Sequence, residues 1–152
     1  MFLELAQETD WNTIRTLSVQ IHDLHVSWRP DIFCHSEEPY PKEKFLDDIQ
    51  NRLVHVARHE SSVVGYVVLS IMRKSGPGVV DHTLLRLDSI CVDKAHRGKG
   101  IGSVMMEGVF ALAKAFGCSD VILGVHPEND RAVEFYQKCG FSLRTINMQA
   151  KV

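Results

Sequence analysis

Residues 85–103 read LRLDSICVDKAHRGKGIGS, and this stretch decides the fold. Its first eight residues alternate between apolar and polar side chains, the period of a β-strand with one buried face. A short charged connector follows, and then three glycines at every second position precede an apolar helix that begins near Ser103. On the predicted strand, residues 86, 88, 90 and 92 are expected to share one face and residues 85, 87, 89 and 91 the other.

The glycine run has the properties of a phosphate-binding loop. Glycines leave backbone N–H groups uncovered, and a helix N-terminus adds free donors and a partial positive charge. Arg97 and Lys99 add two full charges beside it. A Walker loop is excluded because Gly100 follows Lys99 where a metal-binding hydroxyl is needed, and the glycine spacing differs from the dinucleotide-binding fingerprint. The alternative is an ordinary glycine-rich turn with a solvated Arg97.

Composition restricts the class of protein. The 152 residues are most simply one domain, and 45% hydrophobic with 24% charged residues is ordinary for a globular protein. A formal charge of −2 and a pI near 6.4 argue against nucleic acid as the partner. The longest apolar stretch, residues 63–72, is too short to span a bilayer, and no secretory signal is evident, so no membrane partner is expected. Four cysteines without a Cys-x-x-Cys pair predict reduced thiols, a cytoplasmic location and no metal site.

The remaining patterns predict an alternation of strands and helices. Expected strands cover residues 2–6, 54–58, 63–72, 85–92 and 121–125, and residues 141–148 are weakly strand-like. Expected helices cover residues 11–25, 42–53 and 103–116, and a last helix opens at residues 127–130 and is closed by Gly140. Residues 28–41 are irregular. An α/β fold class follows from this order.

A second motif lies on the last helix: Asn129-x-x-Ala132-x-x-Phe135-Tyr136-x-x-x-Gly140-Phe141. Together with Arg-x-x-Gly-x-Gly after a strand ending in Ile-x-Val, it resembles the signatures of the GNAT superfamily of acetyl-CoA-dependent N-acetyltransferases. The specific resemblance covers about residues 84–141. It implies one domain over residues 1–152, with an acceptor-side region of about residues 1–53. It further implies a mixed sheet splayed between the fourth and fifth strands, with helices on both faces and the pantetheine arm in the gap.

The resemblance also implies residue roles. Acetyl-CoA would be bound by the end of the central strand, the glycine loop and the last helix: Ile90, Cys91, Val92, Arg97, Gly98, Lys99, Gly100, Ile101, Gly102, Ser103, Asn129, Ala132, Phe135 and Tyr136. His25 and Trp28, with His22, Arg29 and Asp31 nearby, lie where the family builds its acceptor pocket.

The chemistry requires three further functions. A backbone N–H near Ile90 would stabilise the oxyanion, and Tyr136 would protonate the leaving thiolate. The alternative for Tyr136 is a packing role with its hydroxyl at the surface. An alkyl amine arrives protonated, so a base or a water chain must remove a proton. The resemblance points to Asp88, because family members that act on diamines and polyamines carry an acid two residues before the position of Ile90. Asp in place of Glu is a departure, so Asp88 would act as a base through water or only as an amine-binding carboxylate. It could instead be a surface residue paired with Arg86. The other candidate bases are His82, His126 and Glu128.

The predicted function is therefore transfer of acetyl from acetyl-CoA directly to a primary amine in a ternary complex. A small-molecule acceptor is expected, because Gly124 stands where relatives that acetylate ribosomal-protein N-termini carry a Glu. The alternatives are a protein or peptide N-acetyltransferase, an acyl-CoA-binding sensor without turnover, and a nucleotide-binding protein. A homodimer is common in the family.

Overall fold

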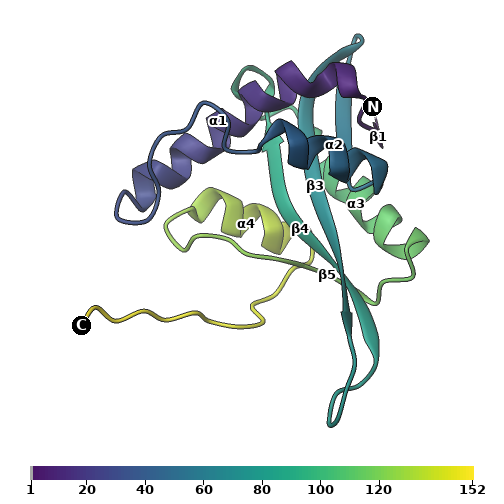
Figure 1. Cartoon of the computed structure of the whole chain (residues 1–152), viewed down its shortest axis with the longest axis vertical. Coiled ribbons are helices and arrows are strands. Elements are labelled where there is room, and N and C mark those ends of the chain that lie inside the picture. Colours follow the sequence, from purple (N-terminus) through teal and green to yellow (C-terminus); the bar gives the residue numbers. More distant parts are fainter. Residues whose placement is uncertain (1) are drawn as a thin grey trace.

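The structure is a computed structural model, and it describes residues 2–152 (Figure 1). The strands are β1 (Leu3–Leu5), β2 (Val54–His59), β3 (Ser62–Lys74), β4 (His82–Val92) and β5 (Asp120–Leu123). The α-helices are α1 (Trp11–Trp28), α2 (Lys42–Gln50), α3 (Ile101–Ala115) and α4 (Asp130–Lys138), and short 3-10 turns cover Glu8–Asp10 and Lys94–His96. Most bounds agree with the sequence patterns to within a few residues, and α3 begins two residues earlier than expected.

The five strands form one mixed sheet in the order β1-β2-β3-β4-β5. Neighbouring strands are antiparallel except for β4 and β5, which are parallel. The parallel pairing covers only the first half of β4, from Leu84 opposite Asp120 to Leu87 opposite Leu123. β3 stays paired with β4 as far as Val92. The sheet is therefore splayed between its fourth and fifth strands, as predicted, and the second half of β4 has an edge that β5 does not cover.

A β-bulge lies where the splay begins. Leu87 faces Leu69 and Ser89 faces Val68, so Asp88 is an additional residue on β4 without an opposing partner. The strict alternation predicted for residues 85–92 is therefore wrong beyond Leu87. Leu85 and Leu87 pack into the core on the α3 side, and past the bulge it is Ile90 and Val92 that do so, while Cys91 belongs to the opposite core. The extra residue shifts the period by one and turns each following side chain to the other face.

Helices cover both faces of the sheet, which confirms the predicted layers. On one face α1 and α2 contribute Ile14, Leu17 and Phe45 to a fully buried cluster. On the other face α3 contributes Met105, Met106 and Val109, and α4 packs against the same cluster with partly buried aromatic side chains. In Figure 1 the helices α1 and α4 lie one above the other beside β4. These two helices approach the splay from opposite faces of the sheet.

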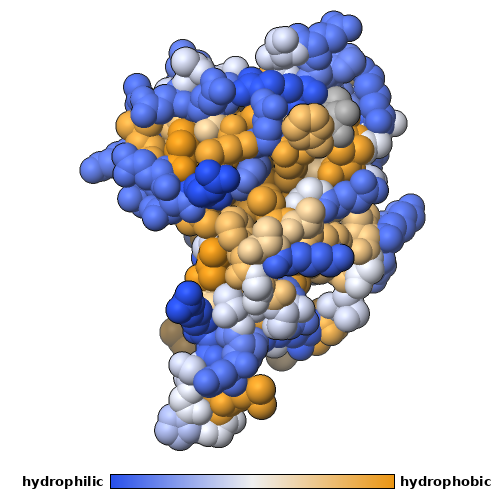
Figure 2. Space-filling model, turned by 90° about the vertical axis from the view of Figure 1, so that its right-hand side faces the viewer, coloured by the Kyte–Doolittle hydropathy of each residue, from blue (hydrophilic) through white to orange (hydrophobic). Residues whose placement is uncertain are grey.

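Two segments extend from this body. The hairpin of β3 and β4 runs far below it in Figure 1, and Figure 2 shows hydrophobic side chains at this lower end. Val79 and Val80, in the connection between the two strands, are exposed. Residues 141–152 form neither helix nor strand, so the strand expected at residues 141–148 is wrong. An extended segment gains ladder hydrogen bonds only beside another strand, and this one pairs with none. Within residues 2–152 no helix is long and apolar enough to cross a membrane.

Candidate active site

A cleft runs along the splay, between the second half of β4, the end of β5 and the facing sides of α1 and α4. Its lining residues come from segments far apart in the sequence: Ile21, His25, Trp28, Leu87, Asp88, Ser89, Ile90, Leu123, Gly124, Val125, His126, Asn129, Ala132 and Tyr136. The cleft exists because β5 leaves β4 after Leu87 and neither strand fills the gap that results. It brings together the predicted acid, the predicted carboxylate and the two predicted acceptor-binding residues.

One wall of the cleft is a single face of α1. Ile21, His25 and Trp28 are spaced by four and three residues, so their side chains lie on the same side of the helix. The Trp28 ring is nearly parallel to that of His126 across the cleft, at 15° with 5.8 Å between ring centroids. His25 contacts Trp28 at 5.8 Å and Phe33 at 5.9 Å. The wall is thus predominantly aromatic, and Phe33 from the irregular segment supports it.

The bulge of β4 forms the floor. Asp88 lines the cleft and is ion-paired with Arg86 through Nε and Oδ1, and its side chain is 28% exposed. The residue is therefore both a carboxylate of the cleft and the ion-pair partner of Arg86. Beside it, the Ser89 hydroxyl lies 3.1 Å from the buried Tyr66 hydroxyl. Because the bulge is anchored on both sides, Asp88 is held at the point where the strands separate.

The opposite wall is α4, which presents Tyr136. This side chain packs on Phe135 at 5.4 Å and edge-on against Phe141 at 5.7 Å between ring centroids. Burial raises the pKa of the Tyr136 phenol to about 12, so the group stays protonated at neutral pH. Asn129 begins the helix, and its Oδ1 accepts a hydrogen bond from the Ala132 amide at 3.2 Å, an N-cap. Its side-chain NH₂ group remains as a donor at the cleft.

The glycine loop joins the end of β4 to α3. Gly98 and Gly100 have φ angles of 77° and 78°, a left-handed conformation that side chains with a Cβ rarely adopt. A Cβ at either position would meet nothing within 4 Å, so backbone conformation and not crowding within the chain explains these glycines. Gly100 is the N-cap of α3, and the loop is exposed. An open loop with bare amides at a helix start fits a phosphate group.

Gly102 is a glycine for a different reason, namely the close approach of α4. It lies in the first turn of α3, and a Cβ there would be 3.3 Å from the Phe135 ring. The missing side chain therefore lets α4 approach the start of α3. As a result, the helix that presents Tyr136 packs directly against the helix that begins at the glycine loop.

The Arg97 side chain folds back to the end of β4. Its Nε donates a hydrogen bond of 2.9 Å to the Val92 carbonyl, while the side chain remains exposed. Its other guanidinium nitrogens can still bind a phosphate. Cys91 precedes Val92 and is buried in the core beneath α1. Burial raises the pKa of the Cys91 thiol to about 11, which favours a packing role for its side chain.

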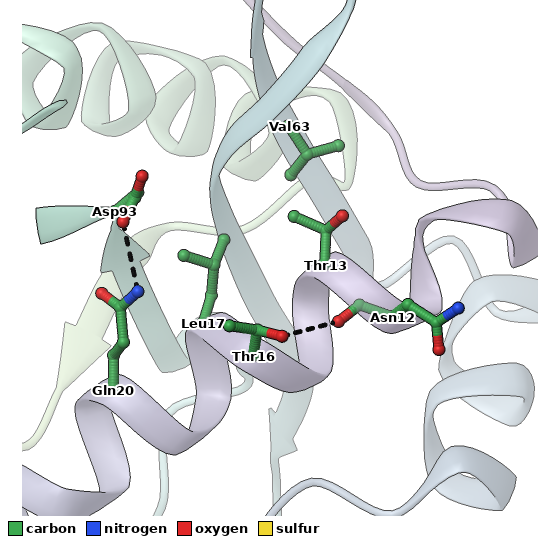
Figure 3. A pocket seen from close by; sticks show the side chains of 7 residues that line it. All are labelled: Asn12, Thr13, Thr16, Leu17, Gln20, Val63 and Asp93. Carbon is green, nitrogen blue, oxygen red and sulfur yellow. Dashed lines mark hydrogen bonds between the residues drawn. The ribbon is translucent and has the colours of Figure 1, made fainter. Parts of the chain in front are cut away.

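A second pocket lies nearer the start of α1 (Figure 3). Gln20 Nε2 donates to Asp93 Oδ1 at 3.1 Å, and Gln20 Oε1 accepts from the Lys94 amide at 3.2 Å. Asp93 Oδ2 is also 3.0 Å from His96 Nδ1. These hydrogen bonds connect α1 to the segment that leads into the glycine loop. Because the polar groups of this pocket bind one another, we assign them a structural role.

Several sequence predictions lie outside the cleft. His82 is at the far end of β4, bonded to the Val80 carbonyl, so it is wrong as a base for this site. Glu128 is exposed and does not line the cleft. His22 is bonded to the Cys34 carbonyl, while Arg29 and Asp31 pair with each other at the end of α1. Within residues 2–152 no cluster of three metal-ligating side chains occurs.

Sequence reasoning missed part of the lining, namely Ile21, Leu87, Ser89, Leu123 and Val125. Ile21 could have been found from its helical spacing to His25 and Trp28. Ser89 could not, because the bulge turns it toward the cleft and nothing in the residues 85–92 indicates that bulge. Leu123 and Val125 line the cleft because β5 ends there.

Known proteins resemble this chain in sequence and in fold. Residues 19–141 match the acetyltransferase (GNAT) family. An uncharacterised N-acetyltransferase of Mycobacterium bovis is 33% identical over 110 residues, which cover 70% of this chain and 65% of the relative. The crystal structure of a tetramutant of the BH1408 protein from Bacillus halodurans has a TM-score of 0.94 at 26% identity, with both chains fully covered.

A further solved structure shares the fold. An aminoglycoside N-acetyltransferase, AAC(6′)-Iy, in complex with CoA, has a TM-score of 0.70 at 18% identity over 99% of both chains. The family match covers most of the sequence, including β4, the glycine loop and α4. The chain therefore belongs to the GNAT family of acetyltransferases.

Proposed function

We propose that this chain transfers the acetyl group of acetyl-CoA directly to the primary amine of a small molecule, with both substrates bound at once. The observation that carries the proposal is the cleft, because it places Asp88, Tyr136 and the aromatic wall of α1 around the uncovered edge of β4. The glycine loop lies at the end of the same strand. We propose that residues 1–152 act as one domain, with the acceptor side in about residues 1–53.

The proposed binding of acetyl-CoA uses backbone groups of β4 and the glycine loop together with three polar side chains. The pantetheine arm would lie along Ile90, Cys91 and Val92, whose edge β5 leaves uncovered, and the side-chain NH₂ group of Asn129 would donate to it. The amides of residues 98–103 and the side chains of Arg97 and Lys99 would take the pyrophosphate. Acetyl-CoA supplies the activated acetyl group as a thioester.

Three groups of the chain serve the transfer. A backbone N–H near Ile90 stabilises the charge that develops on the carbonyl oxygen when the amine attacks. Tyr136 donates its proton to the departing sulfur, and the high pKa of the phenol keeps that proton available. Asp88 either accepts the proton of the incoming ammonium, directly or through water, or anchors that cation. Holding both substrates in one cleft adds the advantage of proximity.

The direct test is release of CoA thiol from acetyl-CoA in the presence of primary amines and peptides. Turnover with small amines supports the proposal, and turnover with peptides alone would indicate a protein N-acetyltransferase. Tight binding of acetyl-CoA without turnover over the whole panel would indicate a sensor. Calorimetry with ATP in place of CoA tests the remaining alternative, a nucleotide-binding protein.

Arg97→Ala is expected to weaken CoA binding about three- to tenfold at low ionic strength and less at high salt. The reason is that an exposed ion pair with phosphate is screened by salt. Titration calorimetry at two salt concentrations measures the difference. An equal loss at both would mean that Arg97 acts through its bond to the Val92 carbonyl, by shaping the loop.

Two further proposals concern the protein in the cell. We propose a cytoplasmic location, supported by the four cysteines being free thiols. We also propose a homodimer, supported by exposed apolar side chains on the hairpin (Val79 and Val80) and on the C-terminal segment (Leu143, Ile146 and Met148). Analytical ultracentrifugation tests the second of these, and a monomer at micromolar concentration would exclude it.

A further inference from the structure

The acceptor end of the cleft has an unusual balance of charge and aromatic surface. Beyond the proposed acetyl-CoA positions, its lining consists of Ile21, His25, Trp28, Leu87, Asp88, Ser89, Leu123, Gly124, Val125 and His126. Within the part of the chain that the structure describes, Asp88 is the only carboxylate among the lining residues. Its charge is already shared, because Arg86 is ion-paired with it. The site therefore offers one partly compensated negative charge for a bound cation.

The histidines make a second cation still less favourable. Burial, followed by the neighbouring His22 and His126, lowers the pKa of His25. A group in this position is thus held neutral by desolvation and by nearby imidazoles. Desolvation acts in the same way on any additional ammonium group of an acceptor, since it would lose water without meeting a second carboxylate among the lining residues. A polyamine or an aminoglycoside would have to place its further ammonium groups outside the cleft.

An anionic acceptor also lacks a partner. Arg86 is ion-paired with the lining residue Asp88, and Arg29, which follows the lining residue Trp28, is bonded to Asp31 at 2.9 Å from Nε and 2.8 Å from Nη2. Nη2 also donates to Gln149 at 2.9 Å. The guanidinium is therefore engaged by a carboxylate and an amide of its own chain. A sugar phosphate would have to displace Asp31 to obtain a bidentate contact.

The aromatic wall supplies the remaining contacts. Trp28 and His126 present nearly parallel rings, and Ile21 and Val125 add aliphatic surface. Flat aromatic groups gain both buried area and ring–ring contacts on such a surface. Half-buried Trp28 presents the largest of these side chains to the cleft.

We propose that the acceptor is a primary monoamine on an uncharged planar or apolar body, an arylalkylamine by chemical class. This inference rests on the proposed acetyl transfer and specifies its substrate. The amine would lie at Asp88, where the uncovered edge of β4 begins, and the ring would lie against Trp28 and His126.

The test compares kcat/KM for phenethylamine, butylamine, spermidine, kanamycin and glucosamine 6-phosphate at saturating acetyl-CoA. We expect phenethylamine to exceed butylamine about tenfold, the scale of an aromatic contact with its buried area, and to exceed the charged compounds about a hundredfold. A higher value for spermidine, kanamycin or the sugar phosphate would overturn the substrate class while leaving the transferase function intact. Absence of turnover with every amine would overturn both.

Trp28 variants isolate the aromatic contact. Trp28→Ala should reduce the ratio of phenethylamine to butylamine kcat/KM to about one to three, and Trp28→Phe, which keeps a ring, should retain most of it. The ratio is insensitive to a general loss of active protein, so it separates recognition from folding. An unchanged ratio in folded Trp28→Ala would overturn the assignment of Trp28 as the acceptor wall.

Discussion

Tyr136→Phe is expected to lower kcat about ten- to a thousandfold while acetyl-CoA affinity changes little. The substitution keeps the ring and its packing on Phe135 and Phe141, and deletes the hydroxyl alone. That hydroxyl is proposed to act on sulfur as the bond breaks, so its removal affects the transition state more than the ground state. Steady-state kinetics with calorimetry of CoA binding separates the two effects.

The pH profile gives an independent measure of the same group. Only the protonated phenol can act as an acid, and burial raises its pKa to about 12 from an ordinary value near 10. An acid of ordinary pKa would begin to be lost above about pH 9, whereas Tyr136 should remain protonated through about pH 10. We therefore expect wild-type kcat to show no decline up to about pH 10 that comes from ionisation of Tyr136. Any decline in this range should also be present in Tyr136→Phe.

A companion variant addresses Asp88. If Asp88 is the base, the loss of kcat in Asp88→Asn should shrink as pH rises and the free amine becomes abundant. If it anchors the cation, the KM of the amine should rise instead.

Full activity of Tyr136→Phe over the amine panel would remove Tyr136 from the mechanism, leaving proximity and the oxyanion donor as its basis.

Gly102→Asp is expected to weaken CoA binding about a hundredfold, or about 2.7 kcal/mol. It places a negative charge in the first turn of α3, at the amides proposed to bind the pyrophosphate. An acidic residue at a helix N-terminus stabilises the helix, so the charge itself should not unfold α3. Calorimetry measures the CoA affinity, and circular dichroism checks that the variant is folded.

Gly102→Asn is the matched control. It introduces a side chain of the same size, with the same 3.3 Å approach of its Cβ to the Phe135 ring, but no charge. We expect Gly102→Asn to weaken CoA binding about tenfold, because the new side chain displaces the Phe135 ring. The further tenfold loss of CoA affinity in Gly102→Asp comes from its charge and should diminish at high salt. Wild-type CoA affinity in folded Gly102→Asp would contradict the assignment of this loop to the pyrophosphate.

Local sequence patterns determined most of the secondary structure and the family. Helical spacing located α1 and α3, and the alternating residues 85–92 located β4, because these patterns depend on which side chains a helix or strand can bury. The glycines of the loop could be interpreted from the sequence for a similar reason. Gly98 and Gly100 have left-handed φ angles, and whether a residue can adopt such an angle depends on its own type and not on distant partners.

The cleft itself depended on tertiary structure. The bulge at Asp88 arises from the register between β3 and β4, so the residues 85–92 alone predicted the wrong face for Ile90 and Val92. Likewise, the pairing of Asp88 with Arg86, the stacking of Trp28 on His126 and the engagement of Arg29 by Asp31 depend on side-chain placement. A residue's type and spacing determine which element it can form, whereas its partners depend on where other elements pack. For this protein, sequence indicated the family and the motifs proposed to bind acetyl-CoA, and the packing of α1 and α4 around the splayed strands decided the shape of the cleft proposed for the acceptor.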